Sequence, residues 1–429
     1  MKLNRLGALL VSVVLILSGC GTSAAPSGGT SDAPSGGTSA APSGGTSGSV
    51  DIWSSLPRQG AAKARTDMVD NAIKLAIEQR GGAVDGWTIN YTTQDDSTAD
   101  AGKWTPEKEL DNATRAVADP SLIAYIGTMN SGAAKISIPI LCKAGIAMIS
   151  PAASYPGLTK PGGGAAGEPD IYYTGCKTGT KDFFRVTPAD DIQGKAGADW
   201  AKALGTSKVF IIDDTEIYGK GIADVFEANA KTDGLTVLGH VQALGTSTDY
   251  KALAAKIKAA GPDLVYYGGI TQNNAGQLWR DLREAMPDLK LMAPEGIGDE
   301  DWLKAAGTAA EGTYLTFPGA PAAQYTGKAA KFRDDFMAKY NVTSLDPYTI
   351  YGYEVANVVL DSMDKAIKDG ASDVATIRSA TLKAIAATKA YNGVLGTWSF
   401  DANGDISLSA FSGMQVVSGQ FTFVKVLGT

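Results

Sequence analysis

The fold of this chain is decided by residues 125–154, which read YIGTMNSGAAKISIPILCKAGIAMISPAAS. Two short apolar runs, Leu122–Gly127 and Ile146–Ile149, have the length and composition of buried strands. The amphipathic segment Ala133–Lys143 joins them, so the stretch predicts a β-α-β unit. Small polar residues follow both strands, and parallel strands bring such loops to one edge of a sheet. The loops are suited to a small polar ligand that approaches backbone N–H groups, although ordinary turns have similar sequences.

The composition is that of a large soluble protein with two or more domains. The chain has 429 residues, of which 44% are hydrophobic and 19% charged. The formal net charge is −7 and basic clusters are absent, so we expect no nucleic-acid partner. Three cysteines argue against a disulfide scaffold or a zinc ribbon. The single histidine, His240, is expected on a strand surface, and we expect neither a metal nor a cofactor.

The N-terminal segment carries the features of export. An apolar run, Leu6–Leu17, follows two basic residues and is too short to span a bilayer comfortably. It ends in Leu-Ser-Gly-Cys at residues 17–20, which resembles the bacterial lipobox, in which the cysteine is lipidated. We expect residues 1–19 to be a lipoprotein signal peptide and Cys20 to be the lipidated mature N-terminus. An ordinary cleavage site beside a cysteine is the alternative.

Residues 20–49 are of low complexity. The unit Ala-Pro-Ser-Gly-Gly-Thr-Ser occurs three times, starting at Ala25, Ala33 and Ala41. Such a segment has too little apolar surface to offset the entropy lost on ordering. We therefore expect a flexible tether.

Alternating strands and helices begin at Val50. The order β-α-β-α-β-α-β is typical of a doubly wound parallel sheet. The segment Lys160–Lys181, which is rich in glycine, interrupts this order and is expected to be a surface insertion. Cys142 and Cys176 are the remaining thiols, and a disulfide between them would fix the insertion in an exported protein. Two free thiols are the alternative, because the sequence does not give their Cα separation.

A second α/β pattern begins at Ile192 and repeats the first architecture. Its predicted strands are followed by polar or glycine-containing loops at Tyr218–Gly221, Gly268–Gly269 and Pro294–Gly298. The acidic pair Asp213–Asp214 at a strand end fits a hydrophilic turn better than a magnesium site. Long helices and a terminal hairpin complete the chain.

Several motifs together resemble the leucine/isoleucine/valine-binding family of periplasmic-type solute-binding proteins, the receptors of ABC importers. The matching pieces, in order along the chain, include Ile126–Gly127, Met148–Ser154, Asp213–Gly221, Asp263–Gly269 and Ala293–Gly298. The resemblance implies two doubly wound α/β lobes joined by three crossover strands. The crossovers would lie near Val186–Pro188, Phe317–Gly319 and Gly396–Ser399. The first lobe would comprise residues 50–187 and 319–396, and the second residues 188–318 and 397–429.

The resemblance also places a ligand in the cleft between lobes that close on it. In the family, hydroxyl residues equivalent to Ser131 and Ser154 hold an amino-acid carboxylate. Backbone N–H groups near Ala152, Ala153 and Ser154 would assist them. A zwitterion does need such donors, which helix N-termini supply.

The second lobe would complete the site. The resemblance implies that Tyr218 lines the wall and that Glu295 binds the ammonium group, which requires an anionic partner when buried. Branched-chain amino-acid binders have an aromatic residue where this chain has Ile270, and a tyrosine that the loop Ser54–Ala62 lacks. We therefore expect the site to bind the backbone of an amino acid, while the sequence does not determine which side chain the pocket accepts.

These features predict a monomeric, lipid-anchored extracytoplasmic solute-binding protein. It would capture an amino acid, with branched-chain ones among the candidates, or a similar small polar solute by hinge closure. An ABC permease would receive the solute, and the lipid anchor would be the only contact with the membrane. The alternatives are a sensing module for a signalling receptor and a binder of another small carboxylate or amide. An enzyme is not expected, because histidine partners, a Gly-x-Ser-x-Gly elbow and a phosphate loop are missing.

Overall fold

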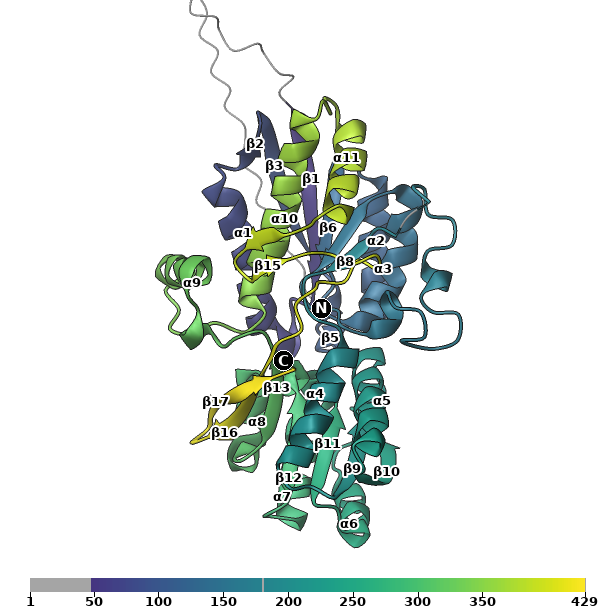
Figure 1. Cartoon of the computed structure of the whole chain (residues 1–429), viewed down its shortest axis with the longest axis vertical. Helices are drawn as coiled ribbons and strands as arrows, with labels where there is room; N and C mark the ends of the chain where they lie inside the picture. Colours follow the sequence, from purple (N-terminus) through teal and green to yellow (C-terminus); the bar gives the residue numbers. More distant parts are fainter. Residues whose placement is uncertain (1–47, 180, 429) are drawn as a thin grey trace, which may run out of the picture. The chain divides into compact units, whose positions relative to one another are not determined.

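The computed structural model describes residues 48–179 and 181–428. The predicted signal peptide, the predicted lipidation site Cys20 and nearly all of the predicted tether lie outside these residues. None of the helices in the described part has the length and hydrophobicity needed to span a bilayer. The described residues form two α/β lobes, each built around its own sheet (Figure 1).

The first lobe is built on a six-stranded sheet. Its strands are β1 (Ser49–Leu56), β2 (Ala83–Val84), β3 (Trp87–Asp95), β6 (Leu122–Gly127), β7 (Ala147–Ser150) and β8 (Phe183–Arg185). They lie in the order β2-β3-β1-β6-β7-β8, and only β2 and β3 pair antiparallel. Every residue of β6 is buried, as expected for a central parallel strand that is covered on both faces.

Helices cover both faces of this sheet (Figure 1). One face packs against α1 (Lys63–Gln79), α10 (Thr349–Lys368) and α11 (Val374–Ala386). The other face packs against α2 (Pro106–Ala118) and α3 (Ser131–Ala144). The short strands β4 (Ser97–Thr98) and β5 (Lys103–Trp104) pair antiparallel, as do β14 (Tyr391–Gly393) and β15 (Gly396–Trp398), and α9 (Gly327–Tyr340) packs beside α10.

The β-α-β unit predicted from residues 125–154 is present as β6-α3-β7. The helix begins at Ser131, two residues before the predicted start, so Ser131 lies in the first turn of α3 and not in a loop. The helix ends at Ala144 and is followed by Gly145, whose positive φ of 70° is the left-handed conformation that terminates many helices.

The second lobe is built on a seven-stranded sheet. Its strands are β9 (Lys208–Asp213), β10 (Thr236–Gln242), β11 (Leu264–Gly268), β12 (Lys290–Pro294), β13 (Tyr314–Pro318), β16 (Phe411–Val417) and β17 (Gln420–Leu427). The order is β10-β9-β11-β12-β13-β16-β17, parallel as far as β13 and antiparallel beyond it. One face packs against α4 (Asp190–Ala203) and α5 (Ile217–Thr232), and the other against α6 (Lys251–Ala260), α7 (Ala275–Ala285) and α8 (Glu300–Ala306).

The predicted loop Tyr218–Gly221 is wrong, because these residues form the first turns of α5. Its two glycines, which suggested a loop, are explained by close packing. A Cβ on Gly219 would lie 2.1 Å from Asp214 Oδ1, and a Cβ on Gly221 would lie 2.6 Å from the Tyr155 ring. The glycines therefore allow the helix to approach its neighbours, and this places Tyr218 at the start of a rigid element.

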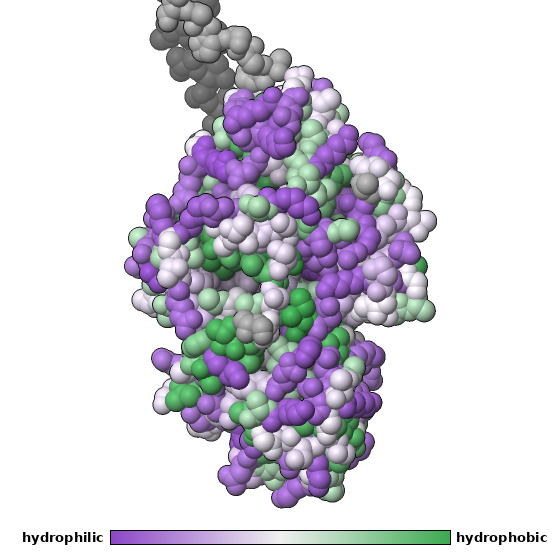
Figure 2. Space-filling view, in the orientation of Figure 1, coloured by the Kyte–Doolittle hydropathy of each residue, from purple (hydrophilic) through white to green (hydrophobic). Residues whose placement is uncertain are grey.

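The chain passes between the lobes after β8, after β13 and before β16. The predicted third crossover at Gly396–Ser399 comes too early, because Trp398, Phe400 and Ile406 pack in the core of the first lobe. We propose that this lobe extends to Ile406 and that residues 407–410 form the crossover. A groove lined by residues such as Pro188, Gly319 and Leu408 lies along the three connections. On the face shown in Figure 2, apolar surface gathers where the lobes meet.

The insertion Lys160–Lys181 is attached to the first lobe by a disulfide and by hydrogen bonds. Cys142 on α3 and Cys176 in the insertion form a disulfide, with their Cα atoms 4.7 Å apart. Glu168, which is 7% exposed, accepts hydrogen bonds from the Tyr155 hydroxyl and the Ala165 N–H, both at 2.8 Å. The insertion therefore folds back toward the loop that follows β7.

His240 on β10 is surrounded by carboxylates. Its Nε2 lies 3.1 Å from Asp213 Oδ2, and its Nδ1 lies 2.7 Å from Glu227 Oε2 and 3.9 Å from Asp224 Oδ1. The hydrogen bond with Asp213, followed by that with Glu227 and opposed by burial, raises the pKa of His240 above its ordinary value. A raised folded-state pKa means that the imidazolium stabilises the fold fully below the unfolded pKa, and that this contribution is lost as pH rises through the folded pKa.

His240→Gln should therefore destabilise the protein more at pH 6 than at pH 9. The measurement is the free energy of urea unfolding of the wild type and the variant at both pH values. A destabilisation of equal size at the two pH values would show that the charge of His240 contributes nothing.

Candidate functional site

A small cavity lies where the two lobes meet. Five predicted ligand-binding residues line it, namely Ser131 and Ala152 from the first lobe and Tyr218, Ile270 and Glu295 from the second. The volume of the cavity that is open to the centre of a water molecule is about 50 Å³. This is several times the space that one enclosed water needs, so the cavity is of a size for a small solute and not for a peptide.

The first-lobe wall is formed where β7 ends and α3 begins. Ser131 opens α3, and the free N–H groups and dipole of a helix N-terminus favour an anion. Its hydroxyl accepts a hydrogen bond from the Tyr155 N–H at 3.2 Å. The Ser150 hydroxyl accepts from the N–H groups of Ala152 at 3.0 Å and Ala153 at 2.7 Å. Two N–H groups predicted to contact a ligand are thus bonded within the protein.

The structure does not bring Ala153 and Ser154 to the cavity. Ala153 is buried and its carbonyl accepts a hydrogen bond from Arg185 Nη1 at 3.2 Å. Ser154 is 2% exposed, and its carbonyl accepts from the Asp190 N–H at 3.0 Å. Contacts from behind the loop therefore draw both residues away from the cavity. The Ser154 side chain instead lies against the carboxyl group of Asp190.

Glu295 occupies the opposite wall, directly after β12, and is 2% exposed. Its Oε1 accepts hydrogen bonds from the hydroxyls of Tyr218 at 3.0 Å and Tyr348 at 2.8 Å. Its Oε2 accepts from Gln193 Nε2. All three donors are neutral, and within residues 48–179 and 181–428 no basic side chain pairs with this carboxylate. A buried anion without a countercharge is costly, so the site is suited to a cationic group of a ligand.

Asp190 lies behind Glu295, at the start of α4. Its side chain is fully buried. Burial, followed by the charge of Glu295, raises the pKa of Asp190 well above its ordinary value and favours the neutral acid. Burial and the charge of Glu295 likewise raise the pKa of Tyr218, which keeps its hydroxyl a donor.

Tyr218 and Ile270 form a small apolar cluster with Ile222. Asp214 fixes the Ile270 loop by accepting the Ile270 N–H at 2.9 Å and Asn273 Nδ2 at 2.8 Å. Burial, opposed by the Asn273 hydrogen bond, raises the pKa of Asp214 to about 7. The predicted hydrophilic turn at the end of β9 is therefore a buried polar anchor.

Several cavity residues were not predicted from the sequence: Ala62, Arg65, Met129, Asn130, Gln272 and Tyr348. Arg65 comes from α1 and Tyr348 directly precedes α10, both far from the recognised motifs. Helix pattern alone would have assigned them to an amphipathic face. Gln193 donates to Glu295 from α4, and nothing in the sequence linked its amide to that carboxylate.

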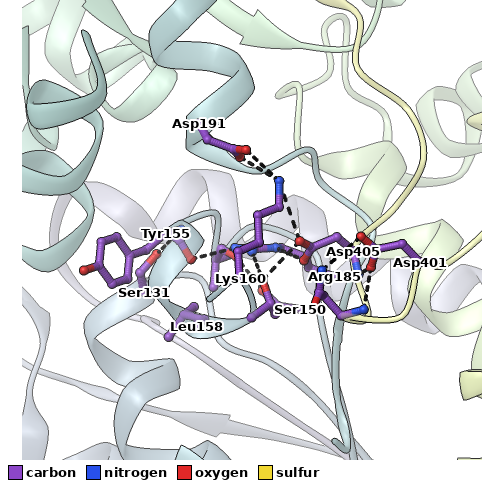
Figure 3. Close-up of polar contacts among 12 residues, drawn as sticks. Ser131, Ser150, Tyr155, Leu158, Lys160, Arg185, Asp191, Asp401 and Asp405 are labelled. Atoms are coloured by element: carbon purple, nitrogen blue, oxygen red, sulfur yellow. Dashed lines mark hydrogen bonds and ion pairs between the residues drawn. The ribbon is translucent and has the colours of Figure 1, made fainter. Parts of the chain in front are cut away.

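Basic side chains of the first lobe reach acceptors of the second. Lys103 Nζ lies 2.8 Å from Glu216 Oε1 and 2.8 Å from Asn273 Oδ1. Lys160 Nζ lies 2.8 Å from Asp191 Oδ2 (Figure 3). The two contacts link the lobes, and neither lysine lines the cavity.

Arg185 fixes the loop that carries the first-lobe wall (Figure 3). Its side chain is fully buried, and its Nε lies 2.7 Å from Asp405 Oδ1. It also donates to the carbonyls of Ala153 and Tyr155 and to the Thr159 hydroxyl. One guanidinium therefore links β8, the loop after β7 and the segment before β16.

The model of a protein family described as periplasmic binding protein matches residues 53–420. The chain belongs to the periplasmic binding protein family. This binding protein is 27% identical over 359 residues to the Leu/Ile/Val-binding protein homolog 3 of Brucella melitensis, covering 83% of this chain and 88% of that relative. The family consists of solute-binding proteins and not of enzymes.

Solved structures share the fold of this binding protein. The leucine-binding protein LivK of Thermotoga maritima matches with a TM-score of 0.74 and 23% identity, covering 88% of this chain and 98% of that one. LivJ of Streptococcus pneumoniae, in complex with isoleucine, matches with a TM-score of 0.72 and 22% identity over 88% and 99% of the two chains. The predicted family and the predicted two-lobed α/β fold are confirmed.

Proposed function

We propose that this protein is an extracytoplasmic solute-binding lipoprotein that captures an α-amino acid between its lobes and delivers it to an ABC importer. Glu295 would bind the ammonium group, and the Ser131 end of α3 would hold the carboxylate. The ligand would stabilise the closed arrangement because only that arrangement contacts both of its charged ends. The proposal of lipid attachment at Cys20 rests on the sequence, and the proposal of transfer to a permease rests on the family.

Glu295 is the observation that carries this proposal. Its carboxylate is buried and, among the described residues, accepts hydrogen bonds only from the neutral donors Tyr218, Tyr348 and Gln193. The residue lines a cavity that has a helix N-terminus on the facing wall. An anion and an anion-binding helix end, on opposite sides of a small cavity, match the two charges of a zwitterion. The name of the Brucella relative supports the same ligand class.

A thermal-shift screen of the purified protein tests the proposal. The panel contains amino acids, their deaminated analogues, small amides and aromatic acids. A specific ligand at about 100 times its Kd should add roughly 2.7 kcal/mol to the stability of the folded state. Stabilisation by an α-amino acid, and not by its deaminated analogue, is the expected result. Stabilisation only by compounds that lack an ammonium group would overturn it.

A further inference from the structure

We propose that the ligand is an α-amino acid whose side chain ends in a carboxamide, and that Arg65, Asn130 and Gln272 recognise this group. The inference rests on the proposed function, because it takes the charged ends of the ligand to be held by Glu295 and the start of α3. The three residues line the same cavity and come from both lobes. None of the three donates a hydrogen bond to the Glu295 carboxylate, which accepts from Gln193, Tyr218 and Tyr348.

Arg65 offers hydrogen-bond donors that the protein does not use. Its Nε donates to Asp346 Oδ2 at 2.8 Å, its Nη1 to the Glu295 carbonyl at 3.3 Å and its Nη2 to the Gly298 carbonyl at 2.8 Å. A guanidinium has five N–H donors. One N–H on each terminal nitrogen is therefore without a partner among the described residues. The side chain is 8% exposed, so an acceptor for these donors would have to come from the cavity.

The charge around Arg65 favours a neutral acceptor over a second carboxylate. The Asp346 carboxylate already pairs with the guanidinium at 2.8 Å. Burial lowers the pKa of Arg65, but the charges of Asp346 and Asp299 outweigh it and raise the pKa above its ordinary value. The arginine is therefore a permanent cation whose charge is balanced. A carbonyl oxygen can use its free N–H groups, whereas a carboxylate would add an unbalanced negative charge beside Glu295.

Asn130 and Gln272 supply the complement for the nitrogen of a carboxamide. Asn130 precedes α3 and Gln272 lies in the turn after β11, on opposite lobes. No hydrogen bond of either side-chain amide occurs within the described part of the chain, and both side chains line the cavity. Each amide oxygen can accept an N–H of the ligand and each amide nitrogen can donate. A branched aliphatic side chain can make none of these hydrogen bonds.

Calorimetric titration of the full chain with an isosteric set tests the inference. L-Asparagine, L-aspartate and L-leucine share a branched Cγ, and L-glutamine and L-glutamate extend the set by one methylene. We expect asparagine or glutamine to bind about ten- to a hundredfold more tightly than leucine and than the matched acid. Tighter binding of leucine, or of either acid, would overturn the inference and leave amino-acid capture intact. Binding of no α-amino acid would overturn the proposed function as well.

Substitution of Arg65 shows whether this residue makes the distinction. Arg65→Lys keeps the charge beside Asp346 but loses the planar fork, and Arg65→Met removes both. Each variant should lose about tenfold or more of the preference for the carboxamide over leucine. Arg80→Met is the matched control, because Arg80 pairs with Asp361 and does not line the cavity. Equal weakening of every amino acid would assign Arg65 to the ligand backbone and overturn the inference, as would an unchanged preference in Arg65→Lys.

Discussion

Glu295→Gln should weaken the binding of an α-amino acid by a factor of between about thirty and several thousand. Removing one partner of a buried, hydrogen-bonded charge pair costs about 2–5 kcal/mol, which corresponds to that range. Glutamine keeps the size of the side chain and an oxygen for the hydroxyls of Tyr218 and Tyr348. The change therefore removes the charge while leaving most of the packing in place.

The deaminated analogue of the same amino acid provides the control. It lacks the ammonium group, so Glu295→Gln should affect its binding little or improve it. Calorimetric titration of both compounds against both proteins completes a thermodynamic cycle. Equal losses for the two compounds would mean that Glu295 shapes the cavity without pairing with a charge. The thermal midpoint of each unliganded protein verifies that the variant is folded.

Arg185→Met should lower the free energy of unfolding by about 3–5 kcal/mol, the range observed when one partner of a buried ion pair is removed. Methionine fills part of the space but leaves the Asp405 carboxylate, which is 4% exposed, without its partner. The carbonyls of Ala153 and Tyr155 lose their donor as well. Ligand affinity should fall with stability, because the loop after β7 carries Ala152.

The pH dependence of unfolding tests the same pair. Burial raises the pKa of Asp405, but the charge of Arg185 and its hydrogen bond outweigh burial and lower the pKa below its ordinary value. A lowered folded-state pKa stabilises the protein above the unfolded pKa, and this stabilisation is lost as pH falls through the folded pKa. Arg185→Met should therefore flatten the loss of stability in acid. Urea unfolding at pH 7 and pH 4 measures the change.

A double variant separates charge from packing. Arg185→Met combined with Asp405→Leu removes both charges and should recover part of the stability that Arg185→Met loses, because no unpaired carboxylate stays buried. If Asp405→Leu destabilises the Arg185→Met variant as much as it destabilises the wild type, the two side chains do not interact energetically.

The sequence predicted the elements that depend on local pattern. The apolar runs that became β6 and β7 are continuous and fully buried, so their composition alone identifies them. The loops after parallel strands converge by topology, and this brought Ala152 and Glu295 to one cavity as expected. The start of α5 was missed, because the glycines beside Tyr218 serve helix packing and look like loop residues in a sequence.

The rest of the cavity depends on contacts that no local pattern encodes. Arg65 and Asp346 are 281 residues apart and meet only because α1 and α10 pack side by side. The orientation of Ser154 is likewise set by Arg185 and Asp190, which hold its loop from behind. Resemblance transfers which positions lie near a ligand. It does not transfer the direction of a side chain when the supporting contacts differ.

The ion pairs of Lys103 with Glu216 and of Lys160 with Asp191 have a consequence for the rate at which a solute enters. Neither pair needs a solute, so each can form whenever the lobes approach in an empty molecule. We expect the two pairs to raise the share of empty molecules in which the lobes are closed, and a solute can enter those molecules only after they reopen. We therefore expect the two lysines to lengthen the time spent closed, and salt to shorten it, because both lysine side chains reach solvent.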